Sequence, residues 1–140
     1  MKYIFKYLIP EYYSILNGNI TLNGQPLPVV DDMASAPQST PYILLGDRTS
    51  FQRQDKSGFL SEITLLVDVV VKGDNFGQGD AEDAANQIMA LINSDNNPDL
   101  SPDFKVVTTS IQSTNNLSTL SPTDRIFRTL IRFRHIVKEL

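Results

Sequence analysis

Residues 125–138 read RIFRTLIRFRHIVK, in which apolar and polar side chains alternate. Successive side chains of a β-strand point to opposite faces of a sheet, so this pattern predicts a strand with two unlike faces. The face expected to join the core comprises Phe127, Thr129, Ile131, Phe133, His135 and Val137. The face expected to form a mixed basic surface comprises Arg128, Leu130, Arg132, Arg134, Ile136 and Lys138.

The strongest strand signal elsewhere is Leu60–Lys72, which holds two apolar triplets on either side of Asp68. β-Branched residues are enriched in strands, and this run predicts a central or nearly central strand. Phe104–Thr114 is expected to form another long strand that precedes the final one. Tyr42–Gly46 is expected to form a short strand.

Polar, glycine-containing or proline-containing stretches separate these apolar runs, and such composition is typical of loops. The expected loops and turns are Asp31–Thr40, Asp47–Gly58, Gly73–Gly79, Asn93–Asp103 and Asn115–Thr123.

A small hairpin is expected near the start of the chain. Ile20–Leu22 and Gln25–Val30 flank Asn23-Gly24, the pair of residues that favours a two-residue type I′ turn. Pro26 and Pro28 confine the second segment to the edge of a sheet, because proline has no backbone N–H to donate.

Two helices are predicted. Apolar residues recur at three- and four-residue spacing from Ile4 to Leu16, and this first helix is expected to end at Asn17-Gly18. Pro10 is expected to kink or restart it. The second helix is predicted over Asp80–Asn93, with Asp80 as the N-cap and one buried apolar face.

The predicted fold is α+β: a mostly antiparallel sheet with an N-terminal helix and a second helix packed on one face. A chain of 140 residues is long enough for one sizeable core. We therefore expect a single domain over residues 1–140.

The composition excludes several classes of site. The chain has no cysteine and a single histidine, His135. Thiolate zinc sites, disulfide scaffolds, iron–sulfur clusters and thiol nucleophiles are therefore excluded, as is any site that needs two imidazoles. We expect no catalytic residue, no cofactor and no metal ion.

The formal net charge is −4, and it is unevenly distributed along the chain. From Lys105 onward basic residues predominate, whereas acidic residues predominate before it. This asymmetry is compatible with self-association between oppositely charged surfaces or with docking on an acidic partner, and either contact should weaken with added salt.

The apolar N-terminal stretch Met1–Leu16 is not expected to be a signal peptide. Lys6, Pro10 and Glu11 interrupt its apolar runs, and no small-residue cleavage site follows. No later segment approaches the length of a membrane span, so no membrane contact is expected.

Two features invite a chemical interpretation, and in both a structural interpretation is favoured. Asp74–Asp80 is acidic and contains glycine, but it lacks the spacing of an EF-hand or a P-loop, so we expect a turn and a helix cap. His135 lies on the predicted apolar face, and no neighbouring nucleophile can be named for it. A packed or edge-exposed structural histidine is therefore expected.

The basic stripe of the final strand, formed by Arg128, Arg132, Arg134 and Lys138, leaves three interpretations open. A solvated strand face is the first, a subunit or partner interface with acidic residues the second, and phosphate contact with a nucleic acid the third. Phe127 points to the opposite face, so the sequence does not favour base stacking on this surface.

The order of these segments resembles that of the small tail-completion, or tail-terminator, proteins of tailed bacteriophages and related prophages. The resemblance covers nearly the whole chain, and the piece Pro41–Asp47 (PYILLGD) is the most telling. The other matching pieces are the opening helix, Ile20–Asp32, Asp55-Lys56, Glu62–Lys72, the helix Asp80–Asn93, and the closing strands that end in Phe133-Arg134-His135.

The resemblance implies a non-enzymatic structural protein of the virion tail or neck, assembled in the host cytoplasm. Its copies would form a ring, often of six, at the head-proximal end of the tail. The ring would end growth of the tail tube and contact the tube protein and the head–tail connector proteins. DNA would pass through it without specific binding. The alternative is a head–tail adaptor, or neck ring protein, on the portal side.

Overall fold

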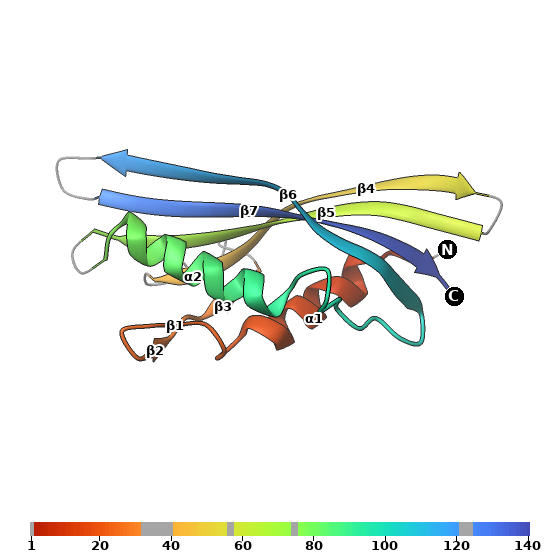
Figure 1. Ribbon diagram of the computed structural model, residues 1–140, viewed down its shortest axis with the longest axis horizontal. Helices are drawn as coiled ribbons and strands as arrows, with labels where there is room; N and C mark the ends of the chain where they lie inside the picture. The colour runs from red at the N-terminus through yellow and green to blue at the C-terminus, as the bar shows by residue number, and fades with distance from the viewer. Residues whose placement is uncertain (1, 32–40, 56–57, 74–75, 121–124) are drawn as a thin grey trace.

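The computed structural model describes residues 2–31, 41–55, 58–73, 76–120 and 125–140 (Figure 1). Two helices and seven strands occur in these ranges. In chain order they are α1 (Phe5–Leu16), β1 (Thr21–Leu22), β2 (Gln25–Pro26), β3 (Val29–Val30), β4 (Tyr42–Asp55), β5 (Gly58–Lys72), α2 (Gln78–Leu91), β6 (Phe104–Leu120) and β7 (Arg125–Glu139).

The main sheet has five strands in the order β3-β4-β5-β7-β6. All neighbouring strands are antiparallel except β3 and β4, which are parallel. β5 is the middle strand, as its apolar composition predicts. The register shifts once between β4 and β5, at Leu45/Arg48, and twice between β6 and β7, at Val106/Thr108 and Ile111/Ser113.

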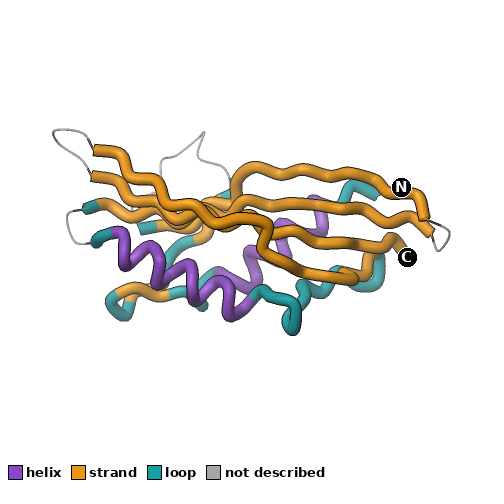
Figure 2. The backbone as a smooth tube through the Cα atoms, turned by 45° about the horizontal axis from the view of Figure 1, so that its top comes forward, coloured by secondary structure: helices purple, strands orange, loops and turns teal. Residues whose placement is uncertain are grey.

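Both helices pack against the same face of the sheet, and the other face carries no described helix (Figures 1 and 2). The alternation predicted for β7 is confirmed: Ile131, Phe133 and Val137 are buried in the core under the helices. The register pairs them with Val67, Leu65 and Ser61 of β5. Each fully buried large apolar side chain contributes about 1.5–3 kcal/mol relative to exposure. The predicted α+β class with a largely antiparallel sheet is therefore confirmed.

Helix α1 buries one side of its surface. Leu8, Tyr12 and Leu16 recur at the four-residue spacing that keeps side chains on one face, and all three are fully buried. The helix is a single element that runs through Pro10 rather than restarting there. Gly18 follows its end with φ +79, the left-handed conformation that favours glycine after a helix.

Helix α2 starts earlier than its sequence predicts. Its N-cap is Gly77, so the prediction that Asp80 is the N-cap is wrong. Asp80 lies in the first turn, where its Oδ2 accepts a hydrogen bond of 2.8 Å from the backbone N–H of Gly77. The carboxylate still accepts a hydrogen bond from a free backbone N–H at the positive end of the helix dipole, but it does so from within the first turn. Neither described helix is long and apolar enough to cross a membrane.

The predicted N-terminal hairpin is confirmed. Leu22 pairs with Gln25 across a turn in which Asn23 has φ 52 and Gly24 has φ 76. Both central residues of a type I′ turn require positive φ, which this dipeptide adopts readily. The chain then reaches the main sheet as β3, an edge strand.

Two of the expected loops are wrong, because most of each is strand. β4 continues through Asp47–Asp55, and β6 continues through Asn115–Leu120. Both stretches are rich in Ser, Thr, Gln and Asn, whose side chains tolerate a solvent-exposed strand. Their backbones pair with β5 and β7 across the two long hairpins. Asn93–Asp103 links α2 to β6 outside the named elements, as predicted. Residues 32–40, 56–57, 74–75 and 121–123 of the expected loops lie outside the described residues.

Candidate functional site

The four basic residues of β7 that the sequence singles out all lie on the helix-free face of the sheet. The register places Arg128, Arg132, Arg134 and Lys138 opposite Val70, Leu66, Thr64 and Leu60 of β5. Opposed residues of an antiparallel pair share one face. The structure therefore places the four predicted residues on one face. It also shows which acidic groups lie beside them, and the sequence does not predict these.

Arg128 forms an ion pair with a buried carboxylate. Its Nε lies 3.0 Å from Oδ2 of Asp68, and its NH2 group also contacts that oxygen. The Asp68 side chain is 3% exposed and the Arg128 side chain 38%. The hydrogen bond that Arg128 donates to Asp68 is the main reason that the pKa of Arg128 is raised above its ordinary value. Arg128 thus neutralises a charge that the central strand would otherwise bury alone.

Glu62 lies between two arginines. Its Oε1 is 2.5 Å from Nε of Arg134, and its Oε2 is 2.7 Å from NH2 of Arg53. The hydrogen bond from Arg134 is the largest cause of the lowered pKa of Glu62. The three side chains come from β7, β5 and β4, so this cluster ties three strands together on the helix-free face.

Arg132 and Lys138 have weaker ionic contacts within the described part of the chain than Arg128 and Arg134 have. NH1 of Arg132 lies 3.3 Å from Oγ1 of Thr64. Its NH2 lies 3.8 Å from a carboxylate oxygen of the exposed Asp47, which is a long distance for an ion pair. Lys138 lies opposite Lys105 of β6, and no described residue forms an ion pair with either lysine. Like charges directly opposite each other are unfavourable in a sheet. These cations are therefore the part of the stripe most open to an external acidic partner.

A shallow depression of about 340 Å³ adjoins Arg132 on this face. Asp47, Thr49, Phe51 and Thr64 contribute to its lining, which is mostly polar in character apart from the phenylalanine ring. Among the described residues no cluster of three or more His, Asp or Glu side chains could hold a metal ion. The chemistry available at this surface is charge pairing and hydrogen bonding.

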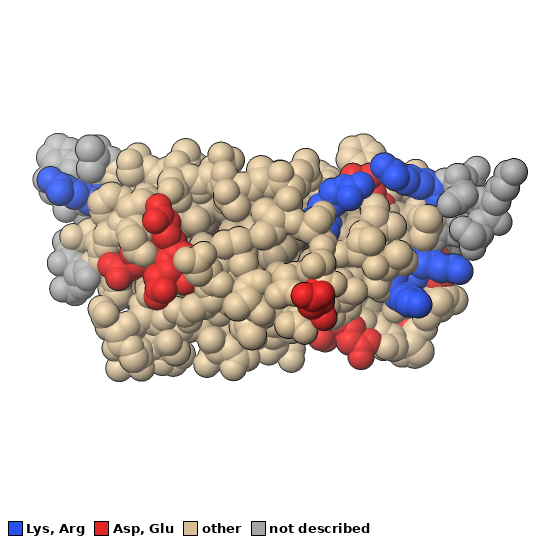
Figure 3. Space-filling view, viewed as in Figure 1, with Lys and Arg blue, Asp and Glu red and all other residues tan. Residues whose placement is uncertain are grey.

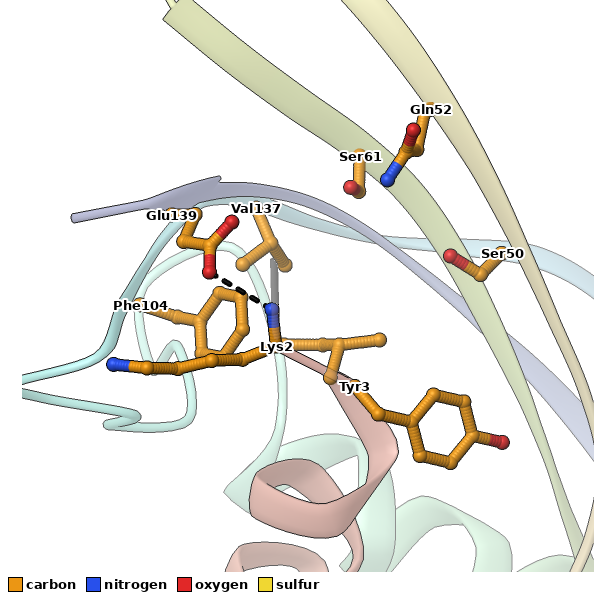
Figure 4. Close-up of a pocket in the computed structure, with 9 residues that line it drawn as sticks. Lys2, Tyr3, Ser50, Gln52, Ser61, Phe104, Val137 and Glu139 are labelled. Carbon is orange, nitrogen blue, oxygen red and sulfur yellow. Dashed lines mark hydrogen bonds between the residues drawn. The ribbon is translucent and has the colours of Figure 1, made fainter.

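A second pocket, of about 270 Å³, lies where the N-terminal segment approaches the end of the β4–β5 hairpin (Figure 4). Ser50, Gln52 and Ser61 face it from the sheet, with Phe104 and Val137 on its apolar side. Glu139 closes one side by accepting a 2.9 Å hydrogen bond from the backbone N–H of Lys2. Lys2 and Tyr3 line the pocket, so the contact fastens the N-terminal segment to the last strand.

His135 is buried and takes part in a chain of hydrogen bonds inside the core. Its Nε2 lies 2.5 Å from the hydroxyl of Tyr12, and its Nδ1 lies 2.9 Å from Oγ1 of Thr109. The Thr109 hydroxyl donates to Oδ1 of Asn97, so it accepts from Nδ1–H of the histidine. The Tyr12 hydroxyl then donates to Nε2. This geometry gives His135 a structural role, the packed one that its place on the apolar face predicts.

Charge is distributed unevenly along the long axis of the molecule. Figure 3 shows acidic side chains gathered over α2, where Glu82 and Asp83 are exposed. Lys and Arg side chains gather toward the opposite end, near the end of the β4–β5 hairpin (Figure 3). The sequence predicts a basic final quarter of the chain. The structure adds that an acidic group lies over α2, whereas several basic residues pair with acidic ones within the molecule.

No protein-family model and no curated protein matches this sequence. The same fold occurs in a virion. A solved structure titled "Virion of native gene transfer agent (GTA) particle" contains a chain that matches this one with a TM-score of 0.73. The match covers 99% of both chains at 18% sequence identity. A match of this extent at so low an identity shows a shared fold from one end of each chain to the other.

Proposed function

We propose that this chain is a structural protein of a virion, without enzymatic activity. It forms a ring at the head-proximal end of a phage-type tail, ends growth of the tail tube and joins the tail to the head. The observation that carries the proposal is the match over 99% of both chains to a component of a gene transfer agent virion. The order of sequence segments supports it independently, because it resembles that of phage tail-completion proteins.

The two sides of the sheet support a ring. The main sheet ends in β6 on one side and in β4 with the short β3 on the other. Two different edges suit a head-to-tail contact, and repeated head-to-tail contacts close into a ring when the rotation between copies allows it. The proposed ring has six copies, contacts the tail tube protein and the head–tail connector proteins, and lets DNA pass without specific binding.

The basic stripe contributes to an interface in this proposal. Arg132 and Lys138 have weak or no ionic partners among the described residues and are available to acidic groups of a neighbouring subunit or another virion protein. Arg128 and Arg134 have internal partners, Asp68 and Glu62, and take part mainly by shaping the surface. Assembly in the host cytoplasm and a final location in the tail or neck of the virion complete the proposal.

The test is electron microscopy of lysates from a phage or prophage that lacks this gene, with the gene restored in trans as the control. Full heads beside unjoined, abnormally long tails are the expected result. Unjoined tails of normal length would contradict termination and favour an adaptor ring on the portal side. Normal infectious particles would contradict both roles.

A further inference from the structure

The outer edge of β6 is long and carries little that would prevent pairing with another strand. Phe104–Leu120 contains one charged residue, Lys105, and no proline. Residues 110–119 are all exposed, and in the described part of the chain β6 pairs only with β7. Exposed sheet edges in soluble proteins usually carry charges, prolines or a covering segment, because unpaired backbone groups bind other strands. An edge without these features suits a partner strand.

The opposite side of the sheet also has unpaired backbone. β3 pairs with β4 at Ile43 and Leu44 only. From Arg48 to Asp55, β4 pairs with β5 on its inner side. Among the described residues no strand pairs with its outer side there. One chain therefore presents two unlike open edges, one on each side of the same sheet.

The directions of the strands make these two edges compatible. β4, β5, β7 and β6 lie in this order and each is antiparallel to the next, so β4 and β6 run in opposite directions. Rotating a second copy about an axis along the strands preserves these directions. Its β4 then arrives antiparallel beside β6 of the first copy, and the alternation continues without a break.

Exposed apolar side chains are concentrated on the same two strands. Of the seven large hydrophobic residues that are exposed in the described part of the chain, four lie on β4 or β6. Phe51 on β4 is 66% exposed, whereas the three on β6, Val107, Ile111 and Leu117, are 42–50% exposed. Apolar side chains at a pairing edge gain cross-strand contacts once a neighbour adds its strand. The apolar groups thus favour the same contact as the backbone.

We propose that β6 of one copy pairs antiparallel with the outer edge of β4 of a second copy, so that one sheet continues through the assembly. This inference rests on the proposed function for the ring and specifies the contact between its subunits. The occupant of both edges is the chain itself, because its two edges are compatible in strand direction and both carry exposed apolar residues.

Disulfide cross-linking tests this contact directly, because the chain has no cysteine of its own. Three variants each combine Phe51→Cys with one cysteine on β6, at Val107, Ile111 or Leu117. β5 and β7 separate β4 from β6 within one chain, so a disulfide between the two strands joins different copies. The matched control combines Phe51→Cys with Ala90→Cys, at an exposed position on α2.

Oxidation is carried out on the purified chain at high concentration and on assembled particles. We expect at least one β6 variant to give a ladder of cross-linked multimers whose top band equals the number of copies in the ring, and the control to give none. Absence of the ladder from both preparations for all three β6 variants would overturn the inference. A ladder from the control variant equal to theirs would also overturn it.

A charged edge gives a second measurement. Val107→Lys and Ile111→Lys together place two cations on the part of β6 that lies level with the open edge of β4, because the registers align Phe51 with Thr108 across the sheet. Asn86→Lys and Ala90→Lys together place two cations on the exposed surface of α2 as a control. We expect the edge variant to lose incorporation into particles while its melting temperature stays near that of the parent, and the control to be incorporated normally. Normal incorporation of the edge variant would contradict strand pairing, while long unjoined tails in the gene deletion would still uphold the proposed function.

Discussion

The hydroxyl of Tyr12 on α1 lies 2.5 Å from Nε2 of His135 on β7, and both side chains are buried. Phe133 lies beside them, with its ring 5.9 Å from that of Tyr12 and 6.5 Å from that of His135. The hydrogen bond joins the first helix to the last strand, at positions 123 residues apart in the chain. A hydrogen bond inside the core therefore fixes how α1 docks on the sheet.

We expect stability to fall in mild acid because of His135. Burial lowers its pKa from 6.5 to about 4. Its contribution is therefore complete above pH 6.5 and is lost as pH falls toward 4, since the unfolded chain binds the proton first. The total loss is on the order of 3 kcal/mol. Urea unfolding across this window, compared with His135→Gln, measures it; identical pH profiles for parent and variant would contradict the prediction.

Phe133→Asp should abolish cooperative folding, because it buries an unpaired carboxylate at a fully buried position of β7. Phe51→Asp is the matched control, since it makes the same change at an exposed phenylalanine on β4. We expect the control to cost about 1 kcal/mol or less. Circular dichroism and thermal melting compare the two. A native-like melt of Phe133→Asp would show that the two faces of β7 are wrongly assigned.

The Asp68–Arg128 pair should contribute measurably to stability. Removing one partner of a fully buried ion pair costs about 3–5 kcal/mol, and partial exposure of the Arg128 side chain places the expected cost of Arg128→Gln below that range. Arg53→Gln, which breaks a more exposed pair with Glu62, should cost clearly less than Arg128→Gln, because solvent screens exposed pairs. Urea unfolding of Asp68→Asn, Arg128→Gln and the double variant gives the coupling energy. A coupling near zero would refute the contribution of the pair.

Charge reversal at Arg132 and Arg134 should impair assembly while the isolated chain stays folded. Arg134→Glu also breaks the pair with Glu62, whereas Arg132→Glu leaves that pair intact, so Arg132→Glu alone is measured beside the double variant. Arg125→Glu, an exposed change on the same strand, serves as the control. Incorporation into particles is quantified beside the melting temperature. Incorporation equal to that of the control would reject an interface role for the two arginines.

Much of the fold could be predicted from the sequence where hydrophobic periodicity was strong. The alternation in β7, the β-branched run of β5 and the Asn23-Gly24 turn each encode their structure locally. The extensions of β4 and β6 do not, because their Ser, Thr, Asn and Gln residues show no apolar period. These stretches become strands through pairing across the two long hairpins, and such pairing depends on residues distant in sequence.

The candidate surface could also be predicted only in part from the sequence. Period-two alternation was enough to place the four cations of β7 on one face. Their partners were not predictable, because Arg128 meets Asp68 across 60 residues of sequence. Only the register between β5 and β7 shows that Arg128 lies diagonal to Asp68, beside its direct partner Val70. A register shift by one residue would move every side chain of the strand to the other face.

The register shifts in the sheet have a geometric consequence for the proposed ring. An extra residue in one strand bends it and increases its local twist. Such shifts occur at Leu45/Arg48 of β4 and at Val106/Thr108 and Ile111/Ser113 of the edge strand β6. If copies join through these edges, the bends set the angle between each subunit and the next. The number of subunits that complete a full turn is then encoded in three short irregularities, and deleting one of them would change the circumference of the ring.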